Sequence, residues 1–271
     1  SLMVGDDATG TIDAANYNTG LGVDVFAALT SGDNNVAVGF AALDANTTAS
    51  NNTAVGYNSL GANTTGAFNT ASGRQALLSN TTGDNNVAVG GNALYQNTTA
   101  DNNTAVGAYS LDANTTGGQN TAVGIYSLSA NTDGEYNTAV GRRALLTNTG
   151  SDNNTAIGAN ALYTFNVASG NGYNTAVGKN AGYAITTGTS NTLVGALTGD
   201  SITTGANNTA IGISALDANT SASSNTAVGS NALGAATTGA LNVAVGSNAL
   251  LTVITGTRNS ALGVGALQLN T

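Results

Sequence analysis

Acidic side chains are the only candidates for acid–base catalysis in this sequence. Its 271 residues include fourteen Asp and Glu but no His and no Cys. Without an imidazole or a thiol the chain cannot form a Ser-His triad, a cysteine nucleophile or a zinc finger. Two carboxylates on a β-helix could act as a glycosidase pair, but no two acidic residues stand out as such a pair. The acidic residues also scatter over different positions of the repeat, which argues against a repeated calcium site. They include Asp33, Asp44, Asp84, Asp101, Asp112, Asp152 and Asp217. We therefore predict no enzyme, no metal and no cofactor.

Aromatic and arginine side chains are the better candidates for binding, because both suit contacts with glycans or proteins on a rigid surface. They occur at variable positions of the repeat described below, and near its single insertion between residues 165 and 173. Packing between copies, ordinary variation and a tolerated insertion are the alternative explanations. The candidate ligand contacts are Tyr109, Tyr126, Arg142, Arg143, Phe165, Asn171 and Tyr173.

Charge and hydropathy exclude two further classes. The net charge is -9 with only five Lys and Arg, whereas a nucleic-acid binder needs cationic side chains to displace counterions from phosphates. No apolar stretch reaches the roughly 18 residues of a membrane-spanning helix. We expect neither nucleic-acid binding nor direct membrane insertion, and the absence of cysteine leaves the compartment open.

A 17-residue repeat runs through the whole chain, with the consensus N-T-A-V-G-x-x-[AS]-L-x-x-N-T-T-G-x-N. One step is 20 residues long, which places three inserted residues within 165–173. We number positions within the repeat from its first Asn and predict a single array, residues 1–271. Its sixteen coils begin at residues 1, 18, 35, 52, 69, 86, 103, 120, 137, 154, 174, 191, 208, 225, 242 and 259.

The positions of the repeat predict short strands and turns rather than helices. Position 5 is Gly in all sixteen copies, as expected where the backbone needs a positive φ or leaves no room for a Cβ atom. Position 4 is aliphatic in fifteen copies and position 9 is Leu in twelve, so we expect these two to form the core. Stacked in register, such units form an all-β parallel β-solenoid, or β-roll.

Position 12 is usually Asn, for example Asn63, and otherwise mostly apolar, for example Ile185. A position that exchanges Asn for Ile is expected to face inward, and stacked amides would satisfy one another by hydrogen bonding along the axis. The Thr residues that follow, from Thr47 to Thr237, are expected on the outer turn.

Position 3 is Ala in thirteen of sixteen copies. Because neighbouring strand residues point to opposite faces, an inward Val at position 4 would place this Ala outward, where a conserved small residue suggests close approach of another rod. The alternative is a cramped interior corner. The candidate trimer interface is Ala37, Ala54, Ala88, Ala105, Ala122, Ala139, Ala227 and Ala244.

The repeated N-T-A-V-G-x-x-A-L, as in residues 52–60 and 225–233, resembles the head repeats of trimeric autotransporter adhesins of the Yersinia adhesin type. It is also similar to repeats in phage tail fibres and other bacterial fibre proteins. The resemblance implies a left-handed parallel β-roll, a side-by-side homotrimer and attachment to host surfaces. The 17-residue unit is longer than the repeat of that family.

The expected function is thus a structural or adhesive segment of an extracellular, cell-surface or virion fibre. Its expected partners are further copies of itself and a glycan or protein of a host surface. The alternative is an ice-binding solenoid, which would need a flat outward array of Thr residues. The adjacent Thr-Thr pairs at positions 13 and 14 cannot both face outward from one strand.

Overall fold

A computed structural model describes the backbone of residues 2–4 and 15–269, and the side chains of 15–269. The chain divides into two compact units, Ser1–Glu135 and Tyr136–Thr271. Each is a parallel β-solenoid with one short strand after every predicted coil start, and the described residues contain no helix. The predicted all-β solenoid is confirmed. Most of the first predicted coil, including its corner Gly5, lies outside the described residues.

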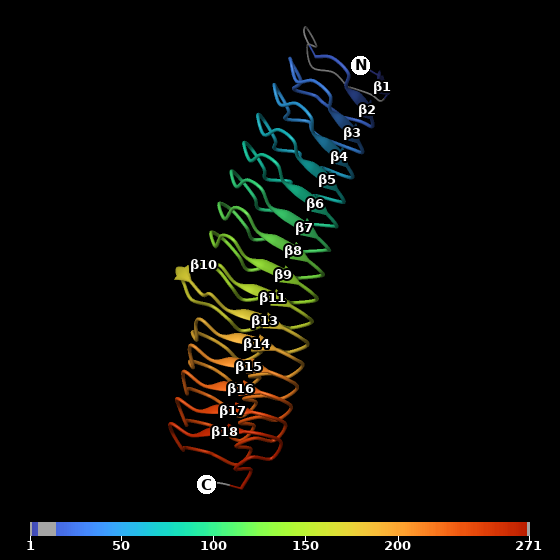
Figure 1. Cartoon of the computed structure of the whole chain (residues 1–271). Coiled ribbons are helices and arrows are strands. Elements are labelled where there is room, and N and C mark those ends of the chain that lie inside the picture. The colour runs from blue at the N-terminus through green and yellow to red at the C-terminus, as the bar shows by residue number, and fades with distance from the viewer. Residues whose placement is uncertain (1, 5–14, 270–271) are drawn as a thin grey trace. The chain divides into compact units, whose positions relative to one another are not determined.

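The first unit stacks its strands in sequence order at 17-residue steps (Figure 1). Each strand pairs in parallel with the next and residue matches residue without a bulge, as Thr53↔Thr70 and Ala54↔Ala71 illustrate. The strands are β1 (Leu2–Val4), β2 (Thr19–Leu21), β3 (Val36–Val38), β4 (Thr53–Val55), β5 (Thr70–Ser72), β6 (Val87–Val89), β7 (Thr104–Val106) and β8 (Thr121–Val123).

The second unit repeats this arrangement around one insertion. The 20-residue step keeps register, since Thr155 still pairs with Thr175, and the extra residues form a loop whose strand β12 pairs with β10. The strands are β9 (Thr138–Val140), β10 (Ser151–Asp152), β11 (Thr155–Ile157), β12 (Gly170–Asn171), β13 (Thr175–Val177), β14 (Thr192–Val194), β15 (Thr209–Ile211), β16 (Thr226–Val228), β17 (Val243–Val245) and β18 (Ser260–Leu262).

The strand faces are the reverse of the sequence prediction. Ala at position 3 points inward, whereas position 4 points outward: Ala54 is 0% exposed and its neighbour Val55 is 39% exposed. The interior takes the smaller residue because Leu at position 9, such as Leu60, fills it from across the coil and is itself 0% exposed. The predicted core is therefore correct for position 9 and wrong for position 4.

Compensating changes in size show that positions 3 and 9 share this interior. In the coil that starts at residue 18, Gly20 occurs with the larger Phe26, whose ring carbon would lie 3.2 Å from a Cβ at residue 20. In the second unit the exchange is reversed. Leu193 occupies position 3, position 9 is glycine at Gly182 and Gly199, and a Cβ at either would come within 3.1 Å of the Leu193 side chain.

This compensation predicts a non-additive pair of substitutions. Leu193→Ala should lower the free energy of unfolding by about 2 to 3 kcal/mol, because it leaves a cavity. Gly199→Leu alone should also destabilise, since its Cβ would lie 2.7 Å from the Ile202 side chain and 3.1 Å from Leu193. The double variant restores the common Ala and Leu pair, so it should unfold at a higher urea concentration than either single variant. Additive losses would contradict shared packing.

Two ladders of buried asparagine satisfy most of the polar groups inside the coils, although the buried Nδ2 of Asn219 has no partner. At position 12 the amide nitrogen of an Asn that follows another Asn donates to the amide oxygen one coil earlier, for example Asn80 to Asn63 at 2.8 Å and Asn97 to Asn80 at 2.9 Å. The predicted ladder is confirmed. The second ladder, at position 1, was not predicted: the amide oxygen of Asn86 accepts from the backbone N–H of Asn103 at 2.9 Å, and its amide nitrogen donates to the Ala100 carbonyl at 2.8 Å.

The glycine at position 5 has both properties predicted for it. At Gly107, φ is +134°, and an added Cβ would lie 2.7 Å from the backbone carbonyl carbon and oxygen of Gly124. Positions 7, 9 and 17 also adopt positive φ in most coils, usually with a non-glycine residue. Asn tolerates this conformation, which explains its frequency at positions 7 and 17. At position 9, burial of the Leu side chain offsets the strain of the positive φ.

Candidate functional site

The outward residues of the strands form the most regular surface in each unit. We define the Thr/Val face as the first and third residues of each three-residue strand at repeat positions 2–4, which are β2 to β8 in the first unit and β9, β11 and β13 to β18 in the second. Most are Thr at the first place and Val or Ile at the third, and neither column contains a charged residue in any coil. Several are well exposed, including Val36 at 37% and Ile211 at 41%.

Strand pairing sets the spacing on this face. The one-to-one register places each outward residue directly beside its counterpart in the next coil, as Val36 lies beside Thr53 and Val38 beside Val55, at about 4.8 Å between neighbouring strands. Along a strand the two outward residues are about 6.6 Å apart. Within each unit, the Thr/Val face is therefore a two-column array of mostly β-branched side chains with fixed periods in two directions.

The two threonine columns differ in what their hydroxyls bind. At position 13 the hydroxyl donates to the Thr carbonyl of the next coil, as Thr81 does to Thr98 at 3.0 Å and Thr98 to Thr115 at 3.1 Å. These residues line the outer turn as predicted, and the fold uses their donors. On the Thr/Val face, the threonine hydroxyls form no hydrogen bond to another described residue. This holds for Thr19, Thr53, Thr70, Thr104, Thr155, Thr175, Thr192, Thr209 and Thr226.

The acidic residues occupy positions of the repeat other than those of the Thr/Val face, mainly positions 16 and 10. At position 16 the carboxylate caps the preceding coil: Asp84 accepts from the backbone N–H of Ala67, and Asp101 from that of Asp84, both at 2.7 Å. At position 10 burial raises the pKa of the carboxyl groups. Such a rise affects Asp44, Asp112, Asp200 and Asp217.

The pKa of Asp112 rises to about 6 because burial removes water from its carboxyl group, whose buried Oδ1 has no hydrogen-bond partner. The folded chain thus binds this proton more tightly than the unfolded chain, so stability should fall as the pH rises from about 4 to about 6 and then level off. Because the group is half exposed, screening limits the effect to about 1 kcal/mol. Asp112→Asn should remove that part of the slope in urea unfolding at pH 4 and pH 7. An unchanged slope would contradict this prediction.

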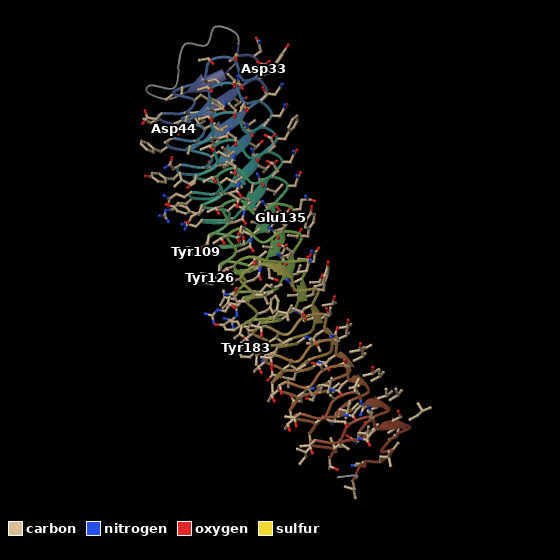
Figure 2. The ribbon with its side chains drawn as sticks, turned by 90° about the vertical axis from the view of Figure 1, so that its left-hand side faces the viewer. Asp33, Asp44, Tyr109, Tyr126, Glu135 and Tyr183 are labelled. Carbon is tan, nitrogen blue, oxygen red and sulfur yellow. The ribbon has the colours of Figure 1, made fainter. Side chains whose placement is uncertain are left out.

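Tyr109 and Tyr126 occupy position 7 of neighbouring coils and lie side by side within the first unit. Their rings stack with centroids 5.1 Å apart and an interplanar angle of 11°. Figure 2 shows both on the same side of the unit as Asp44, with Asp33 and Glu135 on the other side. Each ring covers one face of the other, so the pair stabilises coil stacking by about 0.5–1.5 kcal/mol and leaves less ring surface for a ligand.

The remaining candidate contacts lie in the second unit. Phe165 is 0% exposed because it fills the inward position 12 in place of Asn, so its prediction as a ligand contact is wrong. Tyr173 is 58% exposed, Asn171 and Arg142 are exposed, and Arg143 is half-buried. Residues 166–171 form the predicted small loop, almost all of it exposed.

The prediction that the position 3 alanines form a trimer interface is wrong. Each of these alanines is 0% exposed in the single chain, because position 3 faces the interior, and a second copy cannot reach them. The alternative of a cramped interior position is the correct one. The residues concerned are Ala37, Ala54, Ala88, Ala105, Ala122, Ala139, Ala227 and Ala244.

The described part of the chain contains no pocket and no cluster of three or more acidic residues placed to hold a metal ion. It also contains no helix able to span a membrane. No protein-family model, no curated protein and no solved structure matches the sequence. The Thr/Val face is consequently the candidate functional site.

Proposed function

We propose that the chain is a structural and adhesive segment of an extracellular, cell-surface or virion fibre that attaches to a host cell or another surface. The observation that supports this proposal is that each coil completes its core and its hydrogen bonds by stacking on the neighbouring coils. Two buried asparagine ladders pair most of the interior polar groups, and outward residues of similar type recur in most coils. Such a segment can be lengthened coil by coil without a new core.

The resemblance of N-T-A-V-G-x-x-A-L to adhesin and tail-fibre repeats supports the same proposal. In this proposal the partners are further copies of the chain and a host-surface glycan or protein. The homotrimer and the left-handed winding stay predictions. The exposed loop residues Asn171 and Tyr173 stay candidate contacts for a host-surface ligand.

Light scattering coupled to size exclusion tests the assembly part of the proposal. A trimeric fibre segment predicts a mass near three times 26.3 kDa that persists on dilution. A stable mass of one chain over the same concentration range would contradict a trimer of this segment.

A further inference from the structure

The hydroxyl and methyl array of the Thr/Val face points to a ligand that is itself periodic. The threonine hydroxyls of this face bind no other described residue, whereas the fold uses those at position 13. In most strands a free Thr hydroxyl lies two residues from the methyl groups of Val or Ile, whereas β3, β6 and β17 carry Val at both outward places. The register holds both columns in line. A ligand that matches both columns needs a fixed period along the coil axis and another across it.

Charge and solvation narrow the choice of ligand. The face has no charged side chain in a chain of net charge -9, so it suits an uncharged surface. A second copy of the chain would bury rows of hydroxyls, each of which would need a partner across the interface. Ordered water satisfies every hydroxyl and can surround every methyl group without removing a polar group from solvent.

We propose that the Thr/Val face binds the surface of ice, with its hydroxyls and methyl groups holding water molecules in positions that join the crystal lattice. This inference goes beyond the proposed fibre function, because it assigns the face a ligand other than a host-surface glycan or protein. The objection from sequence, that adjacent Thr-Thr pairs cannot both face outward, does not apply. The outward array consists of Thr at position 2 and Val at position 4, two residues apart on one strand.

The test uses the full chain and two matched tyrosine substitutions within the first unit. Thr104→Tyr places a bulky ring in the middle of the Thr/Val face. Thr99→Tyr places the same ring on an exposed threonine at position 14, outside that face. Ice recrystallisation inhibition and partition of the protein into a slowly growing ice crystal are measured for all three proteins, after urea unfolding confirms that each is folded.

We expect the native chain to inhibit recrystallisation and to enter the ice, Thr99→Tyr to behave like it, and Thr104→Tyr to lose most of both activities. No ice activity in the native chain would overturn the proposal, and so would equal loss in both variants. Solution mass distinguishes this failure from failure of the fibre proposal. A trimer that Thr104→Tyr dissociates, without ice activity, would assign the face to self-association and overturn ice binding alone.

Discussion

Gly107→Ala should destabilise the first unit by roughly 3 to 6 kcal/mol. The backbone at this corner has φ +134°, a conformation that residues with a Cβ rarely adopt, and the added methyl group would lie 2.7 Å from the Gly124 carbonyl carbon and oxygen. Strain and overpacking therefore add together. Neither contact can relax by a side-chain rotation, because the opposing atoms belong to the backbone of the next coil.

Gly91→Ala is the matched control for this substitution. It lies in the same unit at position 6, and no atom lies within 4 Å of its added Cβ. Urea unfolding followed by circular dichroism should show a large decrease in midpoint for Gly107→Ala and little change for Gly91→Ala. Equal midpoints would contradict the close backbone contact at the position 5 corners.

Asn86→Ala should lower the free energy of unfolding by roughly 3 to 5 kcal/mol. The substitution leaves the backbone N–H of Asn103 and the carbonyl of Ala100 without their present partners. Unsatisfied buried groups cost more than the average hydrogen bond contributes, and the lost amide also leaves a cavity. The side chain of Asn86 is 0% exposed, so the groups that lose it are shielded from bulk solvent.

The neighbouring Asn85→Ala is the control for the asparagine ladder. Asn85 has the same side chain but is exposed at position 17, with φ +57°, so its loss should cost only the roughly 1 kcal/mol of backbone strain in alanine. Urea unfolding measures both variants. Similar losses for the two substitutions would contradict a structural role for the position 1 ladder.

The repeat itself was sufficient to predict the coils, the corners and the position 12 ladder. A strand follows every predicted coil start, because the 17-residue period lets each coil pair with the next. Position 12 could be placed inside because it exchanges Asn for Ile or Val. No comparable exchange marked position 1, where Asn is invariant after the first coil, so its ladder was missed.

The side chains of positions 3 and 4 were assigned to the wrong faces of the strand because the larger apolar residue was assumed to face inward. A 17-residue coil encloses little space, and Leu at position 9 already fills much of it. The sequence did contain a signal: Gly20 accompanies Phe26, and Leu193 accompanies Gly199. This inverse relation in size places positions 3 and 9 in one interior and leaves Thr and Val outside, which is the feature on which the candidate site depends.

Cysteine accessibility tests this reversed orientation most directly, and the absence of native cysteine makes the measurement clean. Val55→Cys and Ala54→Cys place a thiol at adjacent residues of β4, where the native side chains are 39% and 0% exposed. In the folded protein, maleimide should label the Val55→Cys variant rapidly and the Ala54→Cys variant only after unfolding in urea. Rapid labelling at residue 54 with protection at residue 55 would contradict the Thr/Val face and the functions proposed for it.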